Sequence, residues 1–180
     1  MKKPDNITRH PKAVIFDLDY TLWPCWCDTH ITTPIKISNS NNLQFNKSPS
    51  IIDKNGYVVQ LFDDIIEIFE YLHSNNILIF TASRTCTPKT AQKMLKLYNI
   101  DKYITASEWG TGSKKSHITQ LLSKYQEIDF SDVCLFDDEW RNIDVEQINV
   151  TFCYLPKEEL NWNEFWRGLQ RWHDKDQVES

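Results

Sequence analysis

Short apolar runs alternate along the chain with segments in which apolar residues recur every three or four positions. The runs that predict strands are residues 13–16, 77–80, 103–106, 133–136 and 150–154. Runs of this length bounded by polar residues are typical of strands buried inside a sheet. The pattern therefore predicts one central sheet.

Helical spacing fills most of the chain between and after these runs. Asp63 and Asp64 suit a helix N-terminus, and Thr87-Pro88 supplies an N-cap followed by proline at the first helical position. A short helix is predicted from about Trp140. The other apolar stripes are Ile65, Phe69 and Leu72; Ala91, Met94, Leu95 and Tyr98; Ile118, Leu121, Leu122 and Tyr125; and Trp162, Phe165, Trp166 and Leu169. Strands alternating with helices predict an α/β fold, a three-layer Rossmann-like doubly wound parallel sheet.

Residues 24–60 interrupt this alternation and lack helical spacing. Within them, residues 38–50 are rich in Asn and Ser, which predicts an exposed, mobile loop. The turn-forming residues 53–56, followed by Tyr57-Val-Val, predict a small β-hairpin. We interpret 24–60 as a flap over the site, a minimal cap within a single domain spanning 1–180; the alternative is a surface loop without a role.

Length and charge narrow the class of protein. At 180 residues, 41% of them hydrophobic and 25% charged, the chain is typical of one soluble globular domain. The net charge of −5 and the absence of a dense Lys/Arg run argue against nucleic acid or an anionic membrane as a partner. No apolar run approaches the ~20 residues that span a membrane. Residues 1–12 are polar, so we expect no secretion signal.

Cysteine and glycine usage excludes further classes. The five cysteines are odd in number and irregularly spaced, which argues against a disulfide framework and favours a reducing compartment. We therefore expect a cytoplasmic protein, with the nucleus as a second location. No cysteine is followed six positions later by the arginine that a cysteine-dependent phosphatase needs. The four glycines form neither a P-loop nor a dinucleotide-binding motif.

Polar side chains gather where the predicted strands end. They are Asp17, Asp19 and Thr21 after the first run, Ser83 and Arg84 after the second, and Asp137 and Asp138 after the fourth, with Lys114 where a helix begins. Parallel strands end at one edge of a sheet, so these groups can converge there. Two carboxylates at one strand end repel each other, which indicates a bound cation or a shared proton.

The combination of charges indicates phosphate chemistry. Carboxylates alone could hold Ca²⁺ or Mg²⁺, and the cationic side chains alone could bind any anion. Together they suit a phosphate monoester carried by a divalent metal, for which Mg²⁺ is the better candidate. One carboxylate can then attack phosphorus while a second protonates the leaving oxygen and later activates water.

Five motifs, in order, resemble the magnesium-dependent phosphatases of the haloacid-dehalogenase-like superfamily. They are FDLDYTLWP (16–24), the Trp26–His30 run, ASRT (82–85), GSK (112–114) and FDDEWRNI (136–143). The resemblance covers roughly residues 12–155. It implies a Mg²⁺-dependent phosphatase that works through a phospho-aspartate.

The resemblance also implies roles for the carboxylates. Asp17 would be the nucleophile and a Mg²⁺ ligand. Asp19 would be the general acid and base, with its backbone carbonyl on the metal. Asp137 would bind the metal directly, and Asp138 would do so through water or by orienting its neighbours.

The remaining roles concern the phosphoryl group. The resemblance implies that Ser83 and Arg84 hold the phosphoryl group or the substrate. Lys114 would offset the charge on Asp17 and on the transferring group, and Thr21 would bond within its loop. Thr81 is an alternative to Ser83 as the phosphate-binding hydroxyl, and the match to ASRT favours Ser83.

The expected partner is a phosphorylated small molecule or a phosphotyrosine side chain. The resemblance suggests protein phosphotyrosine, or sugar phosphates such as phosphorylated glycated amines. Residues 38–50 make the flap longer than is usual in the family, which leaves the substrate range open. The alternatives are a non-enzymatic phosphate-binding or phospho-acceptor module, and a phosphotransferase that uses the same aspartate.

Overall fold

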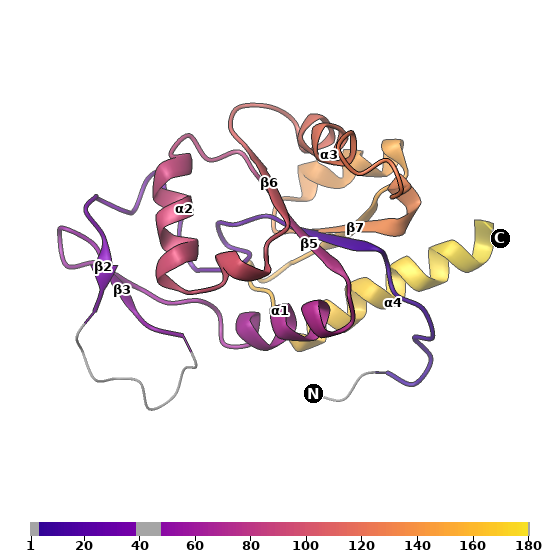
Figure 1. Cartoon of the computed structure of the whole chain (residues 1–180), viewed down its shortest axis with the longest axis horizontal. Helices are drawn as coiled ribbons and strands as arrows, with labels where there is room; N and C mark the ends of the chain where they lie inside the picture. The colour runs from indigo at the N-terminus through magenta and orange to yellow at the C-terminus, as the bar shows by residue number, and fades with distance from the viewer. Residues whose placement is uncertain (1–3, 39–47, 180) are drawn as a thin grey trace.

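A five-stranded sheet forms the centre of the molecule (Figure 1). The computed structural model describes residues 4–38 and 48–179. The sheet runs β6-β5-β1-β7-β8, with every neighbouring pair parallel. Its strands are β1 (Ala13–Phe16), β5 (Leu78–Ser83), β6 (Ala106–Trp109), β7 (Val133–Asp137) and β8 (Thr151–Tyr154). Later strands join β1 on both sides, so the predicted doubly wound parallel sheet is confirmed.

Helices cover both faces of this sheet. Successive residues of a strand point to opposite sides, so an apolar strand presents apolar side chains on each face. Val14 and Phe16 of β1 join one apolar cluster, whereas Ala13 and Ile15 join the other. The first cluster includes residues of α1 (Ile65–Ser74), α2 (Pro88–Leu97) and α4 (Trp162–Glu179), and the second includes residues of α3 (Lys114–Leu122) and the 3-10 helix η3 (Trp140–Ile148). Figure 1 shows α3 on one side of the sheet, with α1 and α4 on the other. The fold therefore has three layers.

The long helix α4 lies unusually close to the sheet at Gly168. A Cβ atom added there would lie 2.4 Å from the ring of Phe136 and 2.9 Å from the sulfur of Cys153. Phe136 also stacks on Phe165 of the same helix, with 5.7 Å between ring centroids. The absence of a side chain at Gly168 thus allows α4 to support β7 directly behind the strand end that carries Asp137.

The predicted strand at 103–106 is wrong in position. Tyr103 ends the 3-10 helix η1 (Asp101–Tyr103), and the strand is Ala106–Trp109. This is an edge strand with all four residues half-buried, so it lacks the continuous apolar run of a central strand. Another short 3-10 helix, η2, spans Phe130–Asp132. Tyr125 lies beyond the end of α3 but still packs on Phe80, with 4.9 Å between the rings.

The insertion forms a small antiparallel sheet, β2 (Lys36–Ile37), β3 (Ile51–Ile52) and β4 (Val58–Val59). The predicted hairpin is confirmed as β3-β4, and β2 is an additional strand. Asp53 shapes the turn because its carboxylate accepts backbone hydrogen bonds from Thr32, Asn55 and Tyr57 at 2.8–2.9 Å. Figure 1 places β2 and β3 at one end of the molecule, beyond α2. Most of the predicted mobile loop, residues 39–47, lies outside the described residues.

Candidate active site

The predicted site residues meet at the carboxyl ends of β1, β5 and β7. They border a hollow of about 250 Å³ at this edge of the sheet. Its lining residues are Asp17, Asp19, Trp26, Asp28, Thr29, Ser83, Arg84, Thr85, Lys114, Asp138, Glu139 and Arg141. Asp137 is fully buried next to this hollow. The parallel register explains the convergence, because all three strands point toward the same edge.

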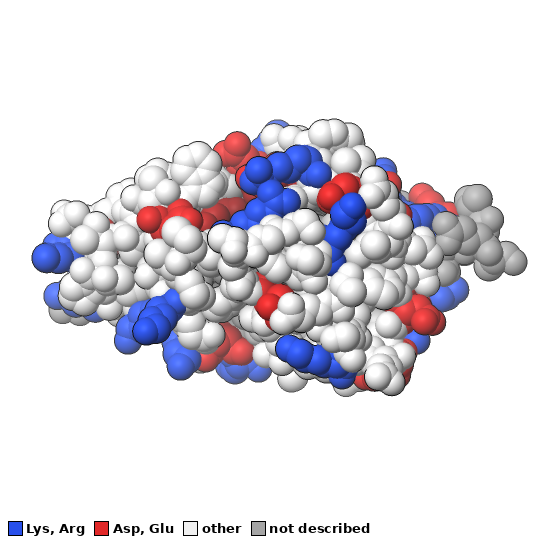
Figure 2. All heavy atoms as spheres, turned by 90° about the horizontal axis from the view of Figure 1, so that it is seen from above, with Lys and Arg blue, Asp and Glu red and all other residues white. Residues whose placement is uncertain are grey.

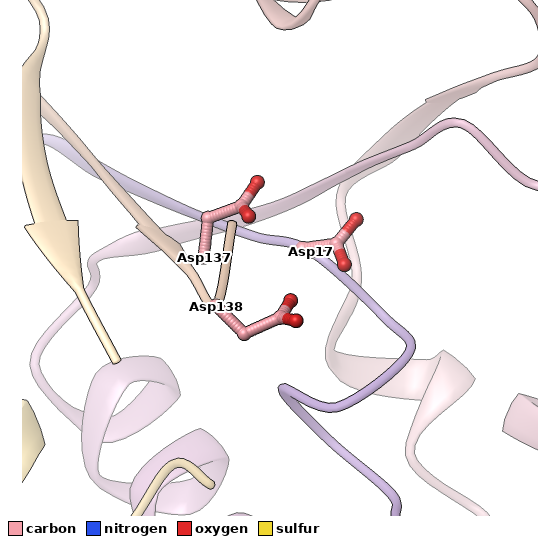
Figure 3. Close-up of side chains that lie close together, drawn as sticks. All are labelled: Asp17, Asp137 and Asp138. Carbon is pink, nitrogen blue, oxygen red and sulfur yellow. The ribbon is translucent and has the colours of Figure 1, made fainter. Parts of the chain in front are cut away.

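Three carboxylates form a group that suits a metal ion. One oxygen from each of Asp17, Asp137 and Asp138 can be chosen so that all three lie within 4.8 Å of one another. Figure 3 shows the three side chains at the ends of β1 and β7, with their carboxylates close together. Oxygen donors of this kind match Mg²⁺, which combines one or two carboxylates with water and substrate phosphate oxygens. The donor set therefore fits the predicted cofactor.

The group carries more negative charge than its burial favours. Burial raises the pKa of Asp138 to about 7, and the neighbouring Asp137 adds to the shift. Burial also raises the pKa of Asp17, which Lys114 opposes. A bound cation would favour the ionised form of both residues. The electrostatics of the three carboxylates thus supports a bound cation, as their donor atoms do.

Lys114 supplies a buried positive charge in this group. It is the first residue of α3, and its side chain is almost fully buried. Its ammonium group donates to Oδ1 of Asp17 and to the carbonyl of Ala82, and lies 3.1 Å from Oδ2 of Asp137. Burial opposes the charge, but the two carboxylates raise the pKa of Lys114, so it remains an ammonium ion.

Asp19 is held apart from the three clustered carboxylates. Its Oδ1 accepts a hydrogen bond from the indole Nε1 of Trp23 at 2.7 Å and another from the backbone amide of Cys27 at 3.0 Å. Burial raises the pKa of Asp19, which favours the protonated form, while these hydrogen bonds oppose the shift. A carboxyl group in this setting can both give and accept a proton, as a general acid and base must.

The structure separates the two candidate hydroxyl groups on β5. Ser83 borders the hollow. Thr81 is fully buried, where its hydroxyl donates to Ser107 at 2.7 Å and accepts from Trp109 at 3.0 Å. The hydroxyl of Thr81 is occupied by side chains of the neighbouring strand β6, so Thr81 is not placed to hold a ligand, whereas Ser83 is.

Arg84 is connected to the carboxylate group through a residue that the sequence analysis missed. Its Nη2 donates to the side-chain oxygen of Asn142 at 2.7 Å, and the amide of Asn142 donates to Oδ2 of Asp137 at 2.8 Å. Asn142 is fully buried, and Nε of Arg84 has no partner among the described residues. Nothing in a lone asparagine within a 3-10 segment distinguishes it in sequence.

The insertion contributes a short segment to the hollow rather than its small sheet. Trp26, Asp28 and Thr29 line the hollow. The ring of Trp26 stacks on His30 with 5.5 Å between centroids, and half of its surface remains exposed. The motif beginning at Trp26 was the available signal, although it did not reveal which side chains face the site.

Comparisons with known proteins identify the family. A family model described as acid phosphatase matches residues 9–175. Human magnesium-dependent phosphatase 1 is 35% identical over 165 residues, which cover 91% of this chain and 88% of the relative. A Saccharomyces cerevisiae protein provisionally named a magnesium-dependent phosphatase is 37% identical over 171 residues, covering 87% and 94%.

A solved structure agrees at the level of the fold. A haloacid-dehalogenase-superfamily hydrolase from Ehrlichia chaffeensis superposes with a TM-score of 0.61 at 15% identity, covering 92% of this chain and 98% of that one. The conserved architecture therefore extends over nearly the whole of both chains. The chain belongs to the acid phosphatase family, together with the magnesium-dependent phosphatases, and has the fold of haloacid-dehalogenase-superfamily hydrolases.

Proposed function

We propose that the protein hydrolyses phosphate monoesters through a phosphorylated Asp17. The observation that carries this proposal is the pairing of Asp17 with the buried ammonium group of Lys114, beside a separately held carboxyl group on Asp19. This arrangement supports Asp17 as the nucleophile and Asp19 as the general acid and base.

Hydrolysis would take two steps. An oxygen of Asp17 attacks phosphorus, and the bond from phosphorus to the ester oxygen breaks with its electron pair on that oxygen. Asp19 gives its proton to the departing oxygen. Water then attacks phosphorus and gives a proton to Asp19, and the bond to Asp17 breaks to release phosphate and restore the carboxylate.

The surrounding charges would make attack by one anion on another possible. Mg²⁺ held by Asp17, Asp137 and Asp138, with the backbone carbonyl of Asp19, would supply positive charge that offsets this repulsion. Lys114 would neutralise Asp17 and the transferring group. Ser83 and Arg84, which border the hollow, would hold the phosphoryl oxygens. In other enzymes, removing one such group by mutation lowers the turnover number about 10²–10³-fold.

For the substrate we propose protein phosphotyrosine, with sugar phosphates such as phosphorylated glycated amines as the second class. The half-exposed ring of Trp26 at the edge of the hollow supports an aromatic leaving group. The small sheet of the insertion lies at one end of the molecule, which supports access by a side chain of another protein (Figure 1).

The face in Figure 2 supports one phosphorylated group rather than a polyanion as the ligand. On the face in Figure 2, acidic and basic side chains lie interspersed, in keeping with the net charge of −5. Among the described residues, no helix combines the length and apolar character needed to cross a membrane.

Product analysis tests this function against its two rivals. Phosphotyrosine, a sugar phosphate and p-nitrophenyl phosphate are incubated with the protein in Mg²⁺ or in chelator, with glycerol as an added acceptor. We expect inorganic phosphate in amounts equal to the released alcohol, and none in chelator. A glycerol phosphate product would favour a phosphotransferase. No release from any ester would favour a binding or phospho-acceptor module.

A further inference from the structure

The carboxylate of Asp19 is held at one oxygen by two donors. Oδ1 accepts from the indole of Trp23 at 2.7 Å and from the amide of Cys27 at 3.0 Å. The thiol of Cys27 also interacts with the carboxyl group, and Asp19 lines the hollow. The carboxyl group of Asp19 is therefore held by the protein through Oδ1 and lies at the edge of the hollow.

Trp23 is itself firmly placed by the loop that follows β1. The loop turns at Tyr20, whose φ of 54° is left-handed, and the amide of Tyr20 donates to the carbonyl of Trp23 at 2.9 Å. The chain therefore doubles back within four residues. This geometry brings the indole of Trp23 against the carboxylate of Asp19.

Packing fixes the other side of the indole. Trp23 is fully buried, and its ring stacks on Tyr98, with 6.1 Å between centroids and 29° between planes. The hydroxyl of Tyr98 donates to the carbonyl of Val59 in β4 at 3.0 Å. The donor that holds Asp19 is thus anchored to Tyr98, which follows α2, and through Tyr98 to the insertion.

We propose that Trp23 is a positioning residue for Asp19, and that its indole N–H holds Oδ1 so that Oδ2 is presented to the ester oxygen of the substrate. This inference rests on the proposed function. A hydrogen bond to a carboxylate is stronger than one between neutral groups, so it can fix the rotamer of Asp19. Without it, only Cys27 would restrain the carboxylate, through its amide and its thiol.

Leaving-group dependence tests this role, because proton donation matters most when the departing oxygen is strongly basic. Trp23→Phe keeps an aromatic ring against Tyr98 and removes the N–H. The measurement is kcat/KM for p-nitrophenyl phosphate, phosphotyrosine and phosphoserine. General acid catalysis contributes about 10²–10⁴-fold, so we expect Trp23→Phe to lose at least about tenfold on phosphoserine and progressively less toward p-nitrophenyl phosphate.

Three comparisons make the result specific. Asp19→Asn should show the same order of losses, larger in size. Trp23→Phe combined with Asp19→Asn should lose little beyond Asp19→Asn alone, because both changes remove one function. Tyr98→Phe, which removes only the hydrogen bond to Val59, should affect all three substrates alike.

Equal losses on the three substrates for Trp23→Phe, with graded losses for Asp19→Asn, would overturn the positioning role and leave the proposed function standing. Equal losses for Asp19→Asn as well would overturn the proposed acid and the role of Trp23 with it. If Trp23→Phe does not fold, the indole N–H signal of Trp23 is followed by NMR in wild type and in Asp19→Ala. We expect an upfield shift in the variant, and an unchanged signal would overturn the proposal.

Discussion

At the scale of single residues, the site depends on opposite charges that are buried together. Lys114 contacts Asp17 and Asp137, and Asp138 lies beside both carboxylates. A buried charge without a partner is costly. Removing either the lysine or a carboxylate therefore leaves the remaining charges of this group without full compensation. Two variants separate the contribution of the cation from that of the anions.

Lys114→Ala should lower kcat/KM by about 10²-fold or more, as expected for a group that stabilises charge in the transition state. The matched control is Lys115→Ala, because Lys115 is its neighbour on α3 but bonds to Gln147 at 2.8 Å and pairs with Asp144 at 3.5 Å instead. Lys115→Ala should leave the rate nearly unchanged. Thermal unfolding of both variants checks their fold, and a similar small effect in a folded Lys114→Ala would remove this lysine from the mechanism.

Asp138→Asn should stabilise the metal-free protein in a pH-dependent way. The pKa of Asp138 rises from 3.8 to about 7 on folding, so the wild type loses stability as the pH rises through that range. The gain in the variant should grow from about pH 4 to about pH 7 and stay constant above, as measured by the midpoint of thermal unfolding in chelator. Added Mg²⁺ should stabilise the wild type more than the variant. A gain in stability that does not depend on pH would contradict the raised pKa of Asp138.

At the scale of elements, most of the candidate site residues lie at a strand end or a helix start, and Asp19 lies in the loop that follows β1. The amide of Asp17 donates to the carbonyl of Phe136 at 3.0 Å, which extends the pairing of β1 with β7 to the first carboxylate. Helix α3 begins at Lys114, and the hydroxyl of Ser113 caps it by accepting from the amide of Ser116 at 3.1 Å. The site is therefore anchored to the pairing of β1 with β7 and to the capped start of α3.

Gly168→Ala tests the support that α4 gives to β7. In a helix interior this change normally adds about 0.5–1 kcal/mol of stability. Here the new methyl group would overlap Phe136, and overpacking costs about 1–3 kcal/mol, so we expect a net loss. Urea denaturation measures the sign directly. A more stable variant would show that α4 can move away from the sheet at no cost.

At the scale of the whole molecule, the sequence was sufficient for the architecture and for most of the residues that meet at the candidate site. Four of the five central strands and the start of α2 at Pro88 follow from apolar runs and capping residues. The strand β6 was misplaced because an edge strand is only half-buried, so it has no continuous apolar run. A parallel sheet then brings the ends of β1, β5 and β7 together without further information.

Contacts between side chains could not be predicted in this way. The bridge from Arg84 through Asn142 to Asp137 and the bond from Trp23 to Asp19 depend on the path of loops, which periodicity does not describe. The match to ASRT already favoured Ser83 over Thr81, and the structure adds the reason, because the neighbouring strand occupies the hydroxyl of Thr81.

The most direct test of the phospho-aspartate is chemical trapping during turnover. Borohydride reduces an aspartyl phosphate to homoserine, which mass spectrometry detects in the peptide that contains residue 17. With phosphotyrosine or p-nitrophenyl phosphate and Mg²⁺, we expect homoserine at position 17, and none in chelator or in Asp17→Asn, which should also lack turnover. Trapping at another residue, or wild-type turnover by Asp17→Asn, would contradict the mechanism.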